Sequence, residues 1–273
     1  MKHILTIQDI SCVGRCSATV ALPVLSAMGV QCSLLPTAVL STHSAYPGFL
    51  CRDLTRDLLP MADHWASLGV SFDGLYTGYL ANPEQAQAVG DILDMFRPQA
   101  RVILVDPAMA DHGKLYGGLP ETFPQAMKAL CRRADVILPN LTEAALLTGR
   151  DYDPAPGDRE VEVLLTGLLD LGPRAVLITG IGDRPGTTGF RGGDREGRRF
   201  SCSIVPYPKS RHGTGDLFAS VVMGALVRGA DLEQAGRQAA GFVLRCLQES
   251  ANDPRDPRLG VDFEKALPSL FPK

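Results

Sequence analysis

The sequence predicts an α/β fold, in which a mainly parallel central sheet carries helices on both faces. Strand-like and helix-like patterns alternate over almost the whole chain, which is typical of parallel strands joined by crossover helices. The strands are short apolar runs such as 102–105 and 175–179, as expected for strands buried on both faces. No internal repeat or linker divides the chain, so we expect one domain over residues 1–273.

Apolar periodicity and terminal signals predict each element. Gly29 and Gly69 follow apolar helical patterns as C-terminal stops, and Pro83 opens the next helix. Helices are expected at residues 17–28, 52–68, 83–96, 121–133, 142–148, 161–171, 217–228, 232–247 and 262–270. Strands are expected at 3–8, 31–39, 74–77, 102–105, 136–138, 175–179 and 200–205, with an exposed hairpin region over 182–199.

Composition and charge exclude several classes of protein. The net charge is −3 with both signs spread along the chain, so neither a nucleic-acid surface nor an anionic membrane surface is predicted. No apolar run reaches transmembrane length, and the N-terminus enters a strand without a signal-peptide pattern. The seven cysteines form no CxxC pair, which favours reduced thiols in a cytoplasmic protein.

Three common catalytic or binding motifs are also missing from the sequence. No cluster has the spacing of a zinc site, and no G-x-S-x-G nucleophile elbow occurs. The G-x-x-x-x-G-K-[ST] pattern of a Walker phosphate loop is absent as well.

A glycine-rich turn before the helix at 217–228 is the most informative motif. Gly213, Thr214 and Gly215 open this helix, where unpaired backbone N–H groups and the helix dipole can bind a phosphoryl group. Asp216 would repel a phosphate, but it suits a general base that takes a proton from an attacking hydroxyl. The alternative is an ordinary turn with an acidic residue that the dipole favours.

Polar residues follow several of the predicted strands. In parallel sheets, ligands bind outside the carboxyl ends of the strands, so we expect these residues to share one site. They are Asp9, His43, Ser44, Tyr79, Asp106, Asn140, Glu143 and Thr179.

Several of these residues have a purely structural alternative. Asn140 and Glu143 have the spacing of a capping box, yet Glu143 and its waters could also bind Mg²⁺. Asp106 could begin a simple turn, or it could supply a second carboxylate near phosphate and metal. His43 could be a hydrogen-bonded loop residue or a substrate contact.

Taken in order, the motifs resemble the ribokinase-like superfamily and, within it, the pyridoxal (pyridoxamine) kinases. The resemblance extends from the first strand to the penultimate helices. The Asn-x-x-Glu and Gly-Thr-Gly-Asp motifs point to the superfamily, and the Ser-Thr-His-Ser and Thr-Gly-Tyr-Leu stretches point to the vitamin B6 branch. The matching stretches are 4–8, 41–46, 77–80, 105–109, 139–143 and 212–216.

The resemblance implies a three-layer α/β/α sandwich without a separate lid domain, and transfer of the ATP γ-phosphoryl group to the 5′-hydroxyl of a B6 vitamer. Asp216 matches the general base, and Gly213, Thr214 and Gly215 match the anion hole. Nucleotide-binding positions are matched by Asp106, Asn140, Glu143, Thr179 and Gly180, of which Glu143 and Asp106 would hold Mg²⁺ largely through water. Substrate-binding positions are matched by Asp9, His43, Ser44 and Tyr79. A monovalent cation such as K⁺ and a homodimer are further expectations of this family.

Two departures from the family pattern leave alternatives open. Asp9 stands where these kinases have serine, and a carboxylate there could pair with a protonated ring nitrogen or with the amine of pyridoxamine. The segment 110–114 lacks the usual glycine-containing continuation, so no lid is predicted from it. A hydroxymethylpyrimidine or sugar kinase of the same fold is the alternative, and a non-catalytic nucleotide-binding sensor is the alternative from another class.

Overall fold

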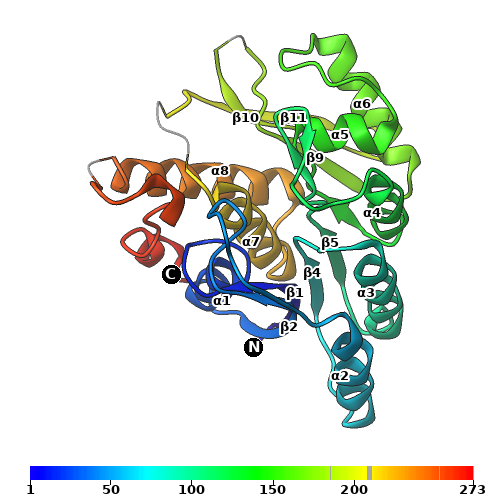
Figure 1. Ribbon diagram of the computed structural model, residues 1–273. Coiled ribbons are helices and arrows are strands. Elements are labelled where there is room, and N and C mark those ends of the chain that lie inside the picture. Colours follow the sequence, from blue (N-terminus) through cyan, green and yellow to red (C-terminus); the bar gives the residue numbers. More distant parts are fainter. Residues whose placement is uncertain (185, 208–210, 252, 273) are drawn as a thin grey trace.

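The computed structural model describes residues 1–184, 186–207, 211–251 and 253–272. It has a nine-stranded sheet in the order β11-β10-β9-β8-β5-β4-β1-β2-β3 (Figure 1). The inner strands run parallel, namely β1 (His3–Ser11), β2 (Gln31–Leu40), β4 (Gly74–Thr77), β5 (Val102–Val105), β8 (Val136–Ile137) and β9 (Ala175–Thr179). The antiparallel strands lie at the edges, namely β3 (Cys51–Asp53), β10 (Thr188–Asp194) and β11 (Arg199–Ile204).

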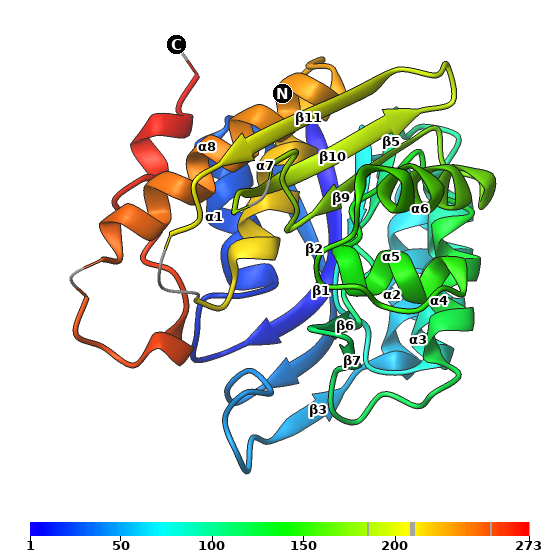
Figure 2. The ribbon, with the colours of Figure 1, turned by 90° about the horizontal axis from the view of Figure 1, so that it is seen from above.

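Helices cover both faces of this sheet, as Figure 2 shows from above. One face carries α2 (Thr55–Ser67), α3 (Pro83–Phe96), α4 (Phe123–Cys131), α5 (Leu141–Thr148) and α6 (Asp158–Asp170). The other face carries α1 (Ala18–Ala27), α7 (Thr214–Val227) and α8 (Leu232–Glu249). The prediction of a three-layer α/β/α fold with a mainly parallel sheet is therefore confirmed.

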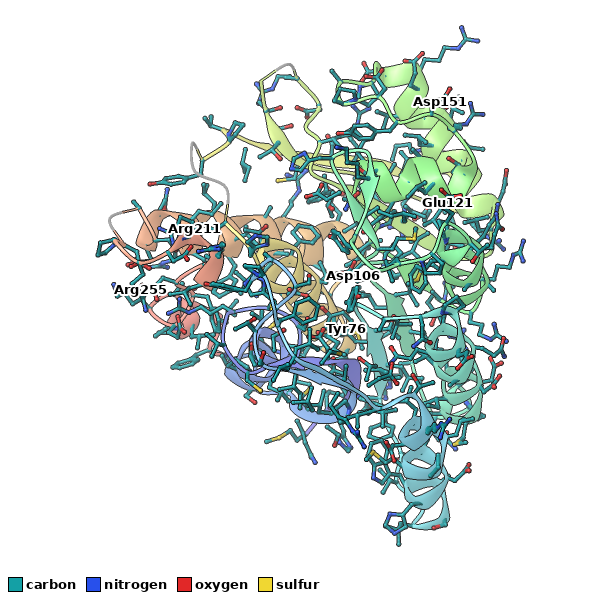
Figure 3. All side chains as sticks on the ribbon, in the orientation of Figure 1. Tyr76, Asp106, Glu121, Asp151, Arg211 and Arg255 are labelled. Carbon is teal, nitrogen blue, oxygen red and sulfur yellow. The ribbon has the colours of Figure 1, made fainter. Side chains whose placement is uncertain are left out.

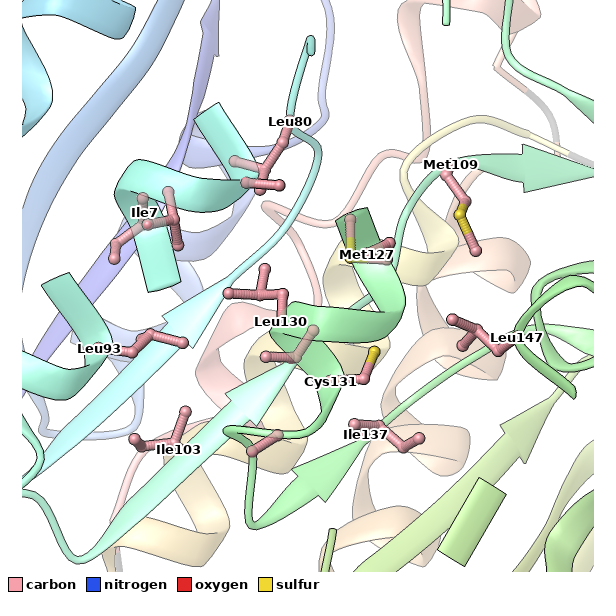
Figure 4. Packing of buried hydrophobic residues seen from close by; sticks show 14 of the residues in the cluster. Ile7, Leu80, Leu93, Ile103, Met109, Met127, Leu130, Cys131, Ile137 and Leu147 are labelled. Atoms are coloured by element: carbon pink, nitrogen blue, oxygen red, sulfur yellow. The ribbon is translucent and has the colours of Figure 1, made fainter. Parts of the chain in front are cut away.

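Alternating strand side chains divide the core into two clusters, one on each face of the sheet. In β1, Leu5 and Ile7 pack toward α2–α6, while Ile4 packs toward α1, α7 and α8. Figure 4 shows part of the first cluster, in which Met109 is fully buried close to Leu147 of α5. Met109 thus anchors the segment that follows β5.

The predicted final helix over 262–270 is wrong. Only two short 3₁₀ turns form near the C-terminus, η1 (Pro257–Leu259) and η2 (Leu267–Leu270). Pro268 has no backbone N–H and disfavours helical geometry at the preceding residue, and the chain forms only the short turn η2 around it.

The helix predicted over 52–68 begins later, at Thr55. Residues Cys51–Asp53 instead form the edge strand β3, which pairs with β2. The Asp53 carboxylate accepts a hydrogen bond from the Thr55 N–H at 2.8 Å, so a local turn separates the strand from the helix.

Two further features differ from the predicted elements, whereas the hairpin predicted over 182–199 is present. The first strand runs on to Ser11, with a register shift between Gln8 and Ile10. The hairpin region over 182–199 contains β10, which pairs with β11. A small second sheet, β6 (Ala110–Asp111) with β7 (Lys114–Leu115), was not predicted, because two-residue strands leave no periodic pattern.

All seven cysteines are free thiols. Within the described part of the chain, no helix has both the length and the apolar character needed to cross a membrane.

Candidate active site

The predicted site residues gather at one edge of the sheet, where the parallel strands end. Asp9 lies near the end of β1, Asp106 directly follows β5, and Thr179 ends β9. Figure 3 labels Asp106 near the middle of the molecule, beside the start of α7. Since the carboxyl ends of neighbouring parallel strands open to the same side, this edge is the expected ligand site of the fold.

The turn before α7 has the geometry of an anion site. The first hydrogen bond of the helix runs from Leu217 N–H to the Gly213 carbonyl at 3.0 Å, so the N–H groups of residues 214–216 precede the helical ladder. Gly213 has φ +85°, and a Cβ there would overlap the Arg15 carbonyl oxygen. Glycine is therefore required at this position both for its backbone angle and for space.

Asp216 lies in the first turn of α7 and is half-buried. Burial raises its pKa to about 6, and the charge of Asp9 acts in the same direction. A hydrogen bond from the Ser17 backbone N–H partly opposes this rise in pKa. The carboxylate is thus poised to exchange a proton close to neutral pH.

The start of α1 meets the start of α7 at this carboxylate. Ser17 is the N-cap residue of α1 and has φ 49°, a left-handed conformation that is unusual for a residue with a side chain. In this conformation its N–H reaches Asp216. Two helix N-termini therefore direct partial positive charge at the same place, which suits a negatively charged ligand.

Asp9 is buried at the irregularity in β1. Its Oδ2 accepts a hydrogen bond from the Ser11 hydroxyl at 3.0 Å, and the Ser17 side chain also hydrogen-bonds to it. Burial nevertheless raises the pKa of Asp9. A β-bulge re-aims the side chains beside it, which explains how Asp9 is directed toward the site rather than into the pleat.

Two further carboxylates, Asp106 and Glu143, lie close together and are almost fully buried. Burial raises the pKa of both groups, and the charges of Glu143 and Asp216 raise the pKa of Asp106 further. Among the described residues, the Asp106 carboxylate has no hydrogen-bond donor. A buried carboxylate of this kind favours the binding of a cation or a proton.

The capping box predicted at α5 is present. Asn140 Oδ1 accepts from the Glu143 N–H at 3.0 Å, and Glu143 Oε2 accepts from the Asn140 N–H at 2.8 Å. The same side chains also hold the segment before β6: Glu143 Oε1 accepts from Met109 N–H at 3.0 Å, and Asn140 Nδ2 donates to the Ala110 carbonyl at 2.7 Å. Both side chains therefore have a structural role, and a role in metal binding stays a prediction.

No cluster of three or more His, Cys, Asp or Glu side chains that could hold a metal ion occurs within residues 1–184, 186–207, 211–251 and 253–272. A cation bound at Asp106 and Glu143 would need ligands from water or from a bound phosphate.

His43 is buried and hydrogen-bonded within the protein. Its Nε2 donates to the Arg258 carbonyl at 2.6 Å, and its Nδ1 accepts from the Ala45 N–H at 3.3 Å. Its ring also lies 5.1 Å from the ring of His212. The hydrogen-bonded alternative fits this geometry, while Ser44 is exposed on the same loop.

Tyr79 is half-buried beyond the end of β4, and its ring lies 6.4 Å from that of Tyr116. Tyr116 follows β7 and was not among the predicted site residues. Tyr116 is 37% exposed, and partial burial and the charges of Glu143, Asp106, Asp111 and Asp216 raise its pKa. The sequence carries no signal for this, because Tyr116 reaches the site only through the small β6–β7 sheet.

Thr179 and Gly180 lie further along the same edge. The Thr179 N–H donates to the Pro139 carbonyl at 2.9 Å, and a β-bridge pairs Thr179 with Asn140. Gly180 is exposed and has φ +80°. Thr179 and Gly180 therefore lie beside the start of α5, at one end of the site. Asp216 and Asp9 lie at the other end.

Comparisons with known proteins agree with this geometry. A family model described as phosphomethylpyrimidine kinase matches residues 51–256. The pyridoxine/pyridoxal/pyridoxamine kinase of Bordetella avium is 30% identical, and the match covers 98% of this chain and 90% of that protein.

Solved structures are similar over nearly the whole length. The pyridoxal kinase of Lactobacillus plantarum is 33% identical with a TM-score of 0.92, covering 99% of this chain and 96% of that one. A Bacteroides thetaiotaomicron protein described as a phosphomethylpyrimidine kinase and crystallised with pyridoxal is 38% identical with a TM-score of 0.93, covering 98% and 95%. The chain therefore belongs to the pyridoxal kinase family of the ribokinase-like superfamily, whose members are phosphotransferases that act on an alcohol group.

Proposed function

We propose that this protein is an ATP- and Mg²⁺-dependent kinase that phosphorylates the 5′-hydroxymethyl group of a vitamin B6 vitamer. The observation that carries the proposal is the placement of Asp216. It is a carboxylate with a pKa of about 6 in the first turn of α7, beside the backbone N–H groups of residues 214–216, which precede the helical ladder. The carboxylate suits proton removal from an alcohol, and the N–H groups suit stabilisation of a phosphoryl group.

In this proposal Asp216 is the general base. With a pKa of about 6 it is mostly ionised at neutral pH, so it can accept the proton of the attacking hydroxyl. The Ser17 N–H holds the carboxylate in place at the start of α1. The N–H groups of residues 214–216 form the anion hole, where they stabilise the charge that develops on the transferred group.

The donor set at Asp106 and Glu143 fits Mg²⁺. Burial raises the pKa of both carboxylates and the charge of Glu143 raises that of Asp106 further, and a divalent cation beside them would relieve this repulsion. Among the described residues no hydrogen-bond donor to Asp106 is present, whereas Glu143 already accepts backbone N–H groups and would act through water. Bound Mg²⁺ would neutralise charge on the nucleotide phosphates. Pyridoxal kinases of Leishmania donovani and Staphylococcus aureus have been solved with ADP and AMP-PCP, which supports a nucleotide ligand.

The vitamer is proposed to bind between Asp9 and Tyr79. Asp9 is a buried carboxylate whose charge acts on both Tyr79 and Asp216, so the three groups lie in one neighbourhood. The pyridoxal of the Bacteroides structure supports a pyridine-ring ligand. A buried carboxylate with a raised pKa gains most from a cationic partner, such as a protonated ring nitrogen or a primary amine.

Some predictions rest on the sequence or on the family resemblance alone. K⁺ as a cofactor, a homodimer and a cytoplasmic location stay predictions, as does the limit of one domain to residues 1–273. Hydroxymethylpyrimidine kinase is the second candidate activity, which the description of the matching family model favours. A non-catalytic sensor would have no use for a base beside the phosphoryl site.

A coupled ADP-release assay with Mg²⁺-ATP tests the proposal. The substrates are pyridoxal, pyridoxamine, pyridoxine, hydroxymethylpyrimidine and a few sugars. We expect turnover with at least one B6 vitamer. Turnover with hydroxymethylpyrimidine or a sugar alone would overturn the choice of substrate, and ATP binding without any turnover would support the sensor.

A further inference from the structure

A short segment near the C-terminus, residues 258–261, contacts three loops of the site with its backbone. The Arg258 carbonyl accepts from Nε2 of His43 at 2.6 Å, and the Leu259 carbonyl accepts from the Arg15 N–H at 3.0 Å. The Val261 N–H donates to the His212 carbonyl at 3.2 Å. We call residues 258–261 the C-terminal brace.

The three loops are far apart in the sequence, and each carries a different part of the proposed site. Arg15 lies between Asp9 and Ser17, so its loop positions the buried carboxylate and the start of α1. His43 precedes Ser44 in the predicted substrate loop. His212 precedes the anion-hole turn. The brace is thus a shared support for groups that must act together.

Two glycines pack against one carbonyl oxygen where the brace meets the site. A Cβ on Gly213 would overlap the Arg15 oxygen, and a Cβ on Gly260 would lie 2.8 Å from the same oxygen and 2.9 Å from the Arg15 Cβ. Gly260 also has φ +91° and ψ −176°, which side chains other than hydrogen scarcely allow. The C-terminal brace therefore packs as one unit with Arg15 and with the anion-hole turn.

Side chains anchor the brace on its far side. The buried Ser250 hydroxyl accepts from the Asp262 N–H at 2.7 Å and donates to the Cys246 carbonyl of α8 at 2.8 Å. Arg15 donates to Glu264 at 2.7 Å and to Asp262 at 3.3 Å.

A second anchor reaches the anion-hole turn itself. The buried Arg211 side chain donates to the Ser250 carbonyl at 3.0 Å and to the Asp253 carbonyl at 3.2 Å. Arg255 pairs with Asp253 at 2.8 Å, and Figure 3 shows Arg211 and Arg255 together on this side of the molecule. The segment before Gly213 is therefore fixed to the end of α8.

We infer that the C-terminal brace is a positioning element that sets the anion hole, the base and the substrate loop in one arrangement, with Gly260 as its key residue. The inference rests on the proposed function for its catalytic consequence. Phosphoryl transfer requires the attacking oxygen, the base and the anion hole to be aligned closely, and misplacement by about 1 Å can cost a hundredfold in rate. None of the brace residues needs to touch the substrate.

Gly260→Ala tests this inference, because the added methyl group pushes the brace away from Arg15. Gly229→Ala is the matched control: Gly229 has φ +100°, lies between α7 and α8 at the end away from the site, and a Cβ there meets no described atom within 4 Å. Both variants suffer backbone strain, but only the first disturbs the brace. We expect kcat to fall about tenfold to a hundredfold in Gly260→Ala, with the KM for ATP within about threefold of wild type. The control keeps its kcat.

Hydrogen–deuterium exchange provides a second measurement that needs no activity. In Gly260→Ala we expect faster exchange in segments 12–16, 43–46 and 212–216 together, and in Gly229→Ala we expect no change in them. Ser250→Ala, which removes an anchor, is the second variant if Gly260→Ala does not fold.

The two measurements separate this inference from the proposed function. If wild-type protein phosphorylates no vitamer but the three segments still loosen together, the proposed function fails and the brace stands. If only residues 257–263 loosen, or if both glycine variants lose kcat equally, the inference is overturned.

Discussion

At Asp216, the stability of the folded protein and the proposed reaction favour opposite protonation states. Burial holds its pKa near 6, so its ionised form is disfavoured in the folded protein, yet the proposed reaction needs that form. Its neighbours at the site, from every element packed there, are Asp9, Cys16, Ser17, Tyr76, Asp106 and Tyr116. Asp9 and Asp106 are the two carboxylates among them, and the charge of Asp9 raises the pKa of Asp216 until a cation or a proton relieves the repulsion.

Asp216→Asn should lower kcat by about a hundredfold to ten-thousandfold, because the amide cannot accept the proton. ATP affinity should stay close to that of wild type, since the backbone N–H groups remain. Steady-state kinetics and a nucleotide titration measure the two effects. Near-normal turnover in this variant would remove Asp216 as the base.

The pH dependence of kcat/KM follows from the raised pKa of Asp216. Below a pH of about 6 the carboxyl is protonated and cannot accept a proton, so kcat/KM should fall about tenfold per pH unit on the acid side. Above that pH the rate should level off. A profile whose acid limb stays flat down to pH 4.5 would contradict this assignment.

Asp9 should influence which vitamer is preferred. In Asp9→Ser we expect the ratio of kcat/KM for pyridoxamine to that for pyridoxal to fall, because the buried charge that attracts the amine is lost. Asp9→Asn keeps the shape without the charge and should change the ratio in the same direction. An unchanged ratio in both variants would show that Asp9 does not select the vitamer.

At the scale of elements, the capping box of α5 joins the helix to the β6–β7 sheet. Asn140→Ala should cost about 1–2 kcal/mol in the free energy of unfolding, through the lost cap and the lost bond to Ala110. It should also raise the KM for Mg²⁺-ATP, because β6–β7 lies against Glu143.

Asp231→Ala is the control for this variant, since Asp231 caps α8 in the same way but lies away from the site. It should lose similar stability in urea denaturation and keep its KM. If both variants shift the KM equally, the link between α5 and the β6–β7 sheet has no functional role.

Local signals account for the elements that the sequence predicts well. The α5 cap is read directly from Asn140 and Glu143, and the turn before α7 from Gly213 to Asp216, because three or four adjacent residues determine each. The resemblance supplied the roles of the other strand-end residues.

Features created by tertiary contacts could not be predicted. Tyr116 reaches the carboxylates only because Asn140 and Glu143 hold the segment before it, and Arg15 matters only because the brace crosses it. The helix expected over 262–270 is replaced by the 3₁₀ turn Leu267–Leu270, so the apolar pattern alone does not predict the structure there.

At the scale of the whole molecule, the sheet concentrates negative charge at one edge. Burial raises the pKa of Asp9, Asp106, Glu143 and Asp216 above their ordinary values. At these four groups the folded protein binds protons more tightly than the unfolded chain, so their contribution to stability is largest where they are protonated.

The stability of the ligand-free protein should consequently fall as the pH rises from about 4 through 6, the window between the ordinary and the raised pKa of Asp216, and further as Glu143 ionises. Urea denaturation at several pH values measures this. The loss should be smaller in Asp216→Asn, which cannot ionise. Equal pH dependence in wild type and variant would contradict the assignment of the shift to Asp216.

The central claim is that this protein transfers a phosphoryl group from ATP to the 5′-hydroxyl of a B6 vitamer. Phosphorus NMR of a reaction containing wild-type protein, Mg²⁺-ATP and pyridoxal or pyridoxamine tests it most directly. We predict a new phosphate monoester signal of the vitamer 5′-phosphate, formed in equal amount with ADP and absent with Asp216→Asn. ADP formed together with inorganic phosphate only, or no ADP with any vitamer, would contradict the claim.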